Sequence, residues 1–111
     1  MLPKNYRLNL AKEFSAVKRT GFALHQTFFT LLVRRNNSNE KRFGFVVSTK
    51  VGKAYIRNRA RRLLREAVKA NLIKVPAGFD LVLIGHPKIK QASYEELNYS
   101  FNNVLSKITK P

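Results

Sequence analysis

The segment KVGKAYIRNRARRLLREAVK, residues 50–69, restricts the fold more than any other part of the chain. It carries eight basic side chains and a single acidic one, Glu66. At 100° per residue, the apolar side chains of a helix over residues 55–72 share one face, formed by Ala60, Leu63, Leu64, Ala67 and Val68. The polar and cationic side chains on the opposite face are Asn58, Arg62, Arg65 and Lys69. The pattern predicts a helix with one packed face and one cationic face.

This charge is not explained by helix stability. The pairs Arg57/Arg61 and Arg61/Arg65 are four residues apart and of like sign, which destabilises a helix slightly. The whole chain has 22 Lys and Arg against 6 Asp and Glu, a formal net charge of +16. A polyanion relieves such repulsion, and arginine holds phosphate oxygens with two donors at once. The composition therefore favours nucleic acid as a partner, with an acidic membrane surface or plain solubility as alternatives.

Other features of the composition limit the class of protein. With 111 residues and 44% hydrophobic content, the chain fits one domain over residues 1–111. Eight Phe and four Tyr argue against disorder. There is no cysteine, no signal peptide pattern and no apolar run of the length that spans a membrane. We expect an intracellular protein of the cytoplasm without a membrane partner.

The remaining elements follow from local patterns and predict an α+β fold. A helix is expected from Asn9 or Leu10 to Thr20, with an apolar stripe and Gly21 just past its end. Two strands are expected over residues 27–35 and 41–49, paired as a hairpin, with a short strand near residues 22–24. A buried strand over residues 79–86 precedes a helix that opens with a Ser93/Glu96 capping box. Residues 1–8 are predicted to be a loosely held basic arm.

No catalytic or metal-binding constellation is found. Glu95 and Glu96 are adjacent, so they diverge on a helix and cannot act as a paired acid and base. His25 and His86 are expected to stand alone at loops or strand ends. Asp80 begins a strand without an obvious catalytic partner.

The segment RFGFVVSTKVGKAYIRNRARRLLREA, residues 42–67, resembles the signature of the bacterial ribonuclease P protein subunit. Its features are a strand, then Lys-x-Gly-x-Ala, then Arg-Asn-Arg on a helix. The N-terminal and C-terminal segments are similar to those of the family as well. The resemblance implies an α-β-β-β-α-β-α fold with a left-handed βαβ crossover. It also implies a protein that binds a catalytic RNA and the 5′ leader of precursor tRNA, with Mg²⁺ and the active site in the RNA.

The resemblance assigns roles to individual residues. The positions that match the motif facing the catalytic RNA are Lys50, Lys53, Arg57, Asn58, Arg59, Arg61, Arg62 and Arg65. Phe14 matches an aromatic residue of the leader-binding cleft, although its apolar stripe is equally typical of a core position. Lys18 and Leu32 stand where the family often has cleft aromatics. Phe28 is expected to compensate, because strand alternation places it on the face of Leu32.

Two other functions compete with this interpretation. One is a structural RNA-binding protein that neutralises folded RNA, and the other is a duplex DNA binder with the basic helix in a major groove. A helix that reads DNA usually belongs to a helix-turn-helix or a dimer. The basic helix expected here follows a strand through a glycine turn, which favours RNA.

Overall fold

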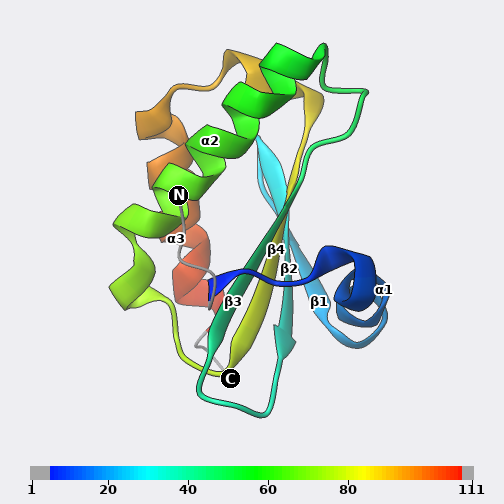
Figure 1. Ribbon diagram of the computed structural model, residues 1–111. Coiled ribbons are helices and arrows are strands. Elements are labelled where there is room, and N and C mark those ends of the chain that lie inside the picture. Colours follow the sequence, from blue (N-terminus) through cyan, green and yellow to red (C-terminus); the bar gives the residue numbers. More distant parts are fainter. Residues whose placement is uncertain (1–5, 109–111) are drawn as a thin grey trace.

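A four-stranded sheet lies between two layers of helices in the computed structural model, which describes residues 6–108 (Figure 1). The elements are α1 (Leu10–Thr20), β1 (Phe22–His25), β2 (Phe29–Arg35), β3 (Lys41–Val46), α2 (Ala54–Ala70), β4 (Phe79–Gly85) and α3 (Tyr94–Ile108). Two short 3-10 helices, η2 (Leu72–Lys74) and η3 (Pro87–Gln91), follow α2 and β4. The α+β class and the order of elements implied by the resemblance are confirmed.

The strands are ordered β1-β2-β4-β3 across the sheet. β4 pairs antiparallel with β2 and parallel with β3, so β2 and β3 do not touch each other as neighbours. The hairpin predicted for residues 27–35 and 41–49 is therefore wrong. Apart from Asp80, the side chains of β4 are apolar on both faces, and a central position buries both faces. Alternation along β2 and β3 could not reveal which strand lies between them.

The connection β3–α2–β4 joins two parallel neighbours. In Figure 1, β3 lies in front of β4 and α2 lies to the left of both. The chain therefore crosses from β3 to β4 in the left-handed sense, an exception to the common right-handed rule.

α2 and α3 cover one face of the sheet and build the larger core. The predicted packed face of α2 is confirmed: its buried residues are Ala60, Leu64, Ala67 and Val68. α3 buries Leu97, Phe101, Val104, Leu105 and Ile108 against the same face. The capping box is present, since Ser93 N donates to Glu96 Oε1 at 3.0 Å and Glu96 N donates to Ser93 Oγ at 3.1 Å.

α1 covers the opposite face and builds a smaller core of Leu8, Val17, Leu32 and Val82. The helix approaches β3 closely because Gly44 has no side chain; a Cβ there would lie 3.0 Å from Leu10 Cγ. The segment before α1 is held too, since Leu8 N donates to Phe43 O at 2.8 Å and Leu8 is buried. The prediction of a loose arm is thus wrong for residues 6–8: Arg7 forms a bridge with Phe43 at the open edge of β3, and Tyr6 packs against the larger core. Residues 1–5 lie outside the described part of the chain.

Candidate nucleic-acid interface

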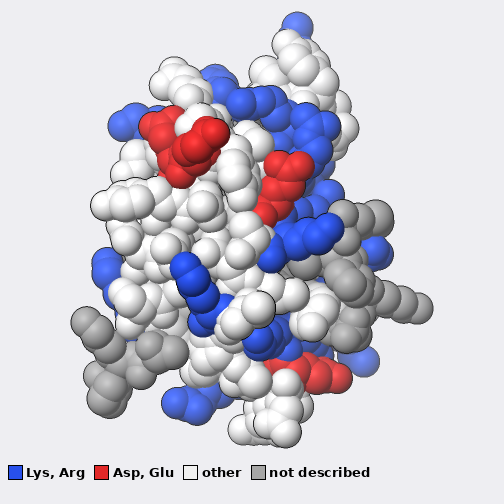
Figure 2. Space-filling model, turned by 90° about the vertical axis from the view of Figure 1, so that its left-hand side faces the viewer, with Lys and Arg blue, Asp and Glu red and all other residues white. Residues whose placement is uncertain are grey.

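The exposed side of α2 carries the basic residues that the sequence singled out. Lys50 and Lys53 precede the helix and are exposed, and Arg57 and Arg61 are half-buried at its edge. The remaining exposed members of the set are Asn58, Arg59, Arg62 and Arg65. In Figure 2, Lys and Arg side chains gather in a band at the upper right of the face shown, and much of the rest of that face is uncharged. We call the set of eight residues from Lys50 to Arg65 the basic face.

Several arginines of the basic face are held in place by the protein itself. Arg57 Nε donates to Gly52 O at 3.2 Å, and Arg59 Nη2 donates to Ala92 O at 3.3 Å. Arg61 Nη1 donates to Asn58 Oδ1 at 2.7 Å. These neutral acceptors fix the side chains without cancelling their charge. The basic face is therefore partly ordered before any partner arrives, which lowers the entropy cost of binding.

Arg65 links the basic face to the edge of the sheet. Its guanidinium carbon lies 5.6 Å from the centre of the Phe45 ring on β3, within the range of a cation–π contact. The two side chains border a hollow of about 180 Å³ that also touches Leu8 and Leu10. Arg62, one turn earlier on the open side, forms no hydrogen bond or ion pair within residues 6–108. Arg65 is thus packed against Phe45, whereas the side chain of Arg62 is free to adjust its conformation to a ligand.

The face of the sheet below α1 is organised in three cross-strand rows. Strand pairing places Arg34, Asp80 and Arg42 in one row and Ala23, Leu32, Val82 and Gly44 in the next. The third row consists of His25, Thr30, Ile84 and Val46. The middle row contributes Leu32 and Val82 to the small core with Val17 of α1. The other two rows lie on either side of it.

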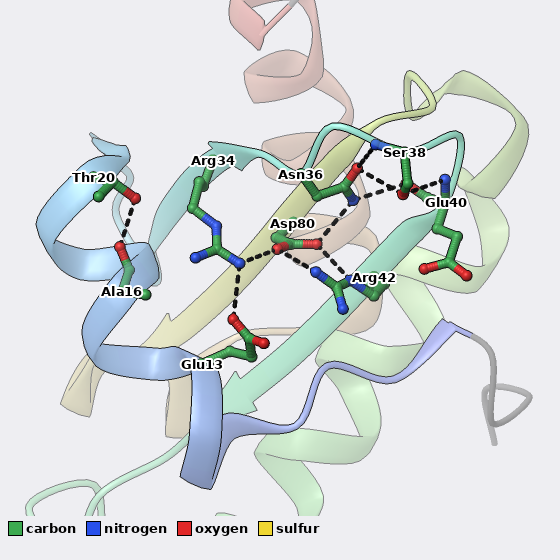
Figure 3. A network of polar contacts seen from close by, with 9 residues as sticks. All are labelled: Glu13, Ala16, Thr20, Arg34, Asn36, Ser38, Glu40, Arg42 and Asp80. Carbon is green, nitrogen blue, oxygen red and sulfur yellow. Dashed lines mark hydrogen bonds and ion pairs between the residues drawn. The ribbon is translucent and has the colours of Figure 1, made fainter.

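The first row is an ionic network that ties α1 to the sheet (Figure 3). Asp80 is fully buried and accepts hydrogen bonds from Arg34 Nη2 at 2.6 Å and from Arg42 Nε at 2.8 Å. Arg42 Nη2 donates as well at 2.9 Å, and Asn36 Nδ2 adds a fourth donor at 3.0 Å. Arg34 Nη2 also reaches Glu13 Oε2 on α1 at 3.1 Å. Nothing local in the sequence predicted this network, because its members come from α1, three strands and a turn.

The network sets the charge state of Asp80. Burial acts to raise the pKa of its carboxyl, but hydrogen bonds from Arg42, Asn36 and Arg34 outweigh burial and leave the pKa below its ordinary value of 3.8. Asp80 is therefore a charged structural group, and its negative charge is already matched by arginines.

Phe14 and Lys18 lie one turn apart on α1, on the flank away from Glu13. Phe14 is half-buried and packs on the small core, as the half-buried Val46 and Ile84 also do. Its ring is thus partly core and partly open, and its role in a leader-binding cleft stays a prediction. Lys18 is exposed in the last turn. Leu32, in contrast, is buried in the middle row.

His25 and His86 are not isolated, contrary to the sequence-based expectation. His25 Nδ1 lies 3.1 Å from Thr30 Oγ1, and His86 Nε2 lies 2.7 Å from the same hydroxyl. Antiparallel pairing of β1 with β2 places His25 opposite Thr30, and β4 delivers His86 just past its end. The residues are distant in sequence, so only the sheet brings them together at the end of the third row.

Phe28 does not lie on the face of Leu32, so that prediction is wrong. Its side chain packs against the larger core on the α3 side, and it borders a pocket with Tyr99 and Glu96. β2 begins at Phe29, and the preceding residues form a turn in which Gln26 N donates to Phe29 O at 2.8 Å. Strand alternation therefore does not extend back to Phe28, and it cannot replace an aromatic residue beside Phe14.

Two further findings bear on the class of function. Within residues 6–108, no helix is both long and apolar enough to cross a membrane. The same residues contain no group of three or more His, Asp or Glu side chains placed to hold a metal ion. The described surface offers a basic face and an open flank of α1, both suited to a phosphate-bearing chain.

Comparison with known proteins decides the family. The family model described as Ribonuclease P matches residues 2–109. The chain belongs to the Ribonuclease P family. The resemblance noted in the sequence is thus confirmed.

Relatives of this family match over most of their length. The "Ribonuclease P protein component" of Clostridium kluyveri is 38% identical over 104 residues, which cover 92% of this chain and 93% of that protein. The protein of the same name from a Thermoanaerobacter species is 32% identical over 107 residues, which cover 96% of this chain and 92% of that protein. The solved ribonuclease P protein of Thermotoga maritima has a TM-score of 0.86 at 31% identity, over 94% of this chain and 98% of that one.

A structure of the Staphylococcus aureus ribonuclease P protein, a mutant described as defective in mRNA degradation, also has a TM-score of 0.86. It is 25% identical and covers 95% of this chain and 89% of that one. The α+β fold is thus shared with solved members of the family.

Proposed function

We propose that this chain is the protein subunit of ribonuclease P, which binds the catalytic RNA and the 5′ leader of precursor tRNA and so assists 5′ maturation of tRNA. In this role it acts in the cytoplasm as part of a ribonucleoprotein. Membership of the family supports the proposal, and the basic face of α2 is the observation that carries it.

The basic face suits an RNA partner in geometry as well as in charge. Its opposite side is locked into the larger core, so the cations project from a rigid element. Arg57 and Arg59 are held by the Gly52 and Ala92 carbonyls and keep their full charge. Phosphates would replace water around these groups and relieve the repulsion between Arg61 and Arg65.

The flank of α1 is the proposed contact for the leader. Phe14 offers part of an aromatic ring and Lys18 an exposed cation, and Val46 and Ile84, which pack on the same small core, add half-buried apolar surface. Since Phe28 lies on the other side of the sheet, Phe14 is the residue from the described part of the chain that we expect to stack there. We therefore expect the charge of Lys18 to replace, in leader binding, part of the contribution that base stacking makes in family members with a second aromatic residue at this position.

The proposal assigns hydrolysis to the RNA. Asp80, the fully buried carboxylate, is occupied by Arg34, Arg42 and Asn36 and is not available to a metal or a water nucleophile. Within residues 6–108, no three His, Asp or Glu side chains are grouped to hold a metal ion. Mg²⁺ prefers oxygen ligands and keeps several waters, and RNA phosphates supply such ligands, so we expect the ion on the RNA.

The test is a cleavage assay with purified protein, a bacterial ribonuclease P RNA and precursor tRNA at low magnesium concentration. We expect the protein to increase correct 5′ cleavage over that by RNA alone, and the protein without RNA to cleave nothing. No increase would reject the proposal in favour of a structural RNA-binding role. Metal-dependent cleavage by RNA-free protein would reject the assignment of the active site.

A further inference from the structure

Two tyrosines of the described chain are equally exposed and stand in opposite electrostatic surroundings. Tyr55 on α2 and Tyr99 on α3 each expose 70% of their surface. Tyr55 belongs to the first turn of α2, between Lys53 and the exposed Asn58 and Arg59. Tyr99 borders a pocket with Glu96. Of the two, Tyr55 is the one that combines an open aromatic ring with the basic face.

Folding does not account for Tyr55. Its ring belongs to neither hydrophobic cluster, and within residues 6–108 it forms no hydrogen bond, cation–π contact or ring contact. Alanine has a higher helix propensity than tyrosine, so the helix itself would be better served by Ala at this position. The neighbouring Ile56, in contrast, packs against the larger core.

Helix geometry places the ring among the groups that would hold phosphates. Arg59 lies four residues after Tyr55 and is its neighbour on the helix surface. Arg62 lies seven residues after Tyr55, nearly two turns, so it projects in almost the same direction about 10 Å along the axis. A strand whose phosphates meet Arg59 and Arg62 therefore has a base within reach of the ring.

We infer that Tyr55 is a stacking platform for an unpaired base of the RNA that the basic face binds. This deepens the proposed function and rests on it. A paired A-form helix keeps its bases stacked and exposes mainly phosphates and 2′-hydroxyls, so it offers no base face to a tyrosine. A bulged or looped nucleotide does. The basic face thus recognises a phosphate track with an unpaired nucleotide at the N-terminal end of α2.

The test separates stacking from charge. RNA affinity is measured as a function of salt for the wild type, Tyr55→Ala, Tyr55→Phe and the matched control Tyr99→Ala, with a bacterial ribonuclease P RNA as ligand. We expect Tyr55→Ala to raise Kd roughly five- to a hundred-fold with an unchanged salt slope, since the net charge stays the same. Tyr55→Phe and Tyr99→Ala stay within about twofold of the wild type. Circular dichroism checks that each variant is folded.

A second readout reports stacking directly. The chain contains no tryptophan, so Tyr55→Trp and Tyr99→Trp each introduce a single reporter. On addition of the RNA, we expect the fluorescence of Tyr55→Trp to be quenched and its accessibility to acrylamide to fall, while Tyr99→Trp changes little. On a fully paired RNA duplex, Tyr55→Ala should bind as the wild type does.

The possible outcomes distinguish this inference from the function on which it rests. If the wild type does not bind the RNA, the proposed function fails. If the wild type binds and Tyr55→Ala binds equally well, the function stands and the stacking platform is refuted. An equal loss of affinity for Tyr55→Ala on the paired duplex would also refute it, because the ring would then contribute without an open base.

Discussion

Replacement of Asp80 by asparagine tests the ionic network below α1. The substitution keeps the shape of the side chain and removes its charge. Arg34 and Arg42 would then be without the carboxylate that both contact, and the new amide group would present donors to other donors. The tie between α1 and the sheet would also weaken, since Glu13 reaches the network through Arg34.

The size of the effect follows from burial. Removal of one partner of a buried ion pair costs roughly 3–5 kcal/mol. Asp80 has 0% of its side chain exposed, while Arg34 and Arg42 keep 16% and 27%, so both arginines can recover some hydration. We therefore expect a loss at the lower end of this range, about 3 kcal/mol in the free energy of unfolding. With a urea m-value of about 1–3 kcal/mol/M, the midpoint should fall by about 1–3 M.

The assay is urea unfolding followed by circular dichroism, with Glu95→Gln as the control. Glu95 is an exposed acid of α3 without a hydrogen bond or ion pair in the described residues, so the control makes the same change in net charge with little change in midpoint. Since the pKa of Asp80 is lowered in the folded state, its contribution is complete above pH 4 or so and disappears as pH falls through the folded value. The difference in urea midpoint between the wild type and Asp80→Asn should therefore become smaller as the pH is lowered.

A midpoint that moves no further than that of Glu95→Gln would refute this reasoning. A difference in midpoint between the wild type and Asp80→Asn that stays constant down to about pH 2 would also refute it, because the stabilisation would then not depend on the charge of Asp80.

Three further predictions concern the basic face, α1 and α3. Arg62→Ala combined with Arg65→Ala should weaken RNA binding and reduce the salt slope by about 0.7–0.9 for each phosphate that is no longer neutralised, measured by titration at several salt concentrations. Gly21→Ala should destabilise the fold by about 1–3 kcal/mol in urea unfolding, because a Cβ there would overlap the backbone oxygen of Val33 on β2. Ser93→Ala should cost about 1 kcal/mol in thermal unfolding, because the capping box is removed.

Each of these has its own check. Lys88→Ala combined with Lys90→Ala removes the same charge from η3. An equal drop in the salt slope of RNA binding for that pair would mean that the basic face contributes no more than other basic surface residues do. Gly21→Ala with wild-type stability would show that α1 can shift away from β2 at no cost. For Ser93, the variant Ser93→Thr keeps a hydroxyl cap and should retain most of the stability; a destabilisation equal to that of Ser93→Ala would argue against capping.

The sequence determined what depends on neighbours along the chain. The 3.6-residue period decided which side of α2 is packed and which is cationic, because every side chain on a helix has a direction set by its position. Gly21 and the Ser93/Glu96 box marked helix ends through local backbone chemistry. Local patterns also predicted the short strand β1, and the match to a known family added the left-handed crossover between β3 and β4.

The tertiary structure decided what depends on which strands meet. Local alternation is the same whether β3 pairs with β2 or with β4, so the hairpin was predicted where β4 is inserted. The same pairing brings Asp80 to two arginines from other strands and joins His25 to His86 through Thr30. Strand pairing joins residues that are far apart in the sequence and depends on burial of the whole sheet. No short segment of sequence can therefore predict it.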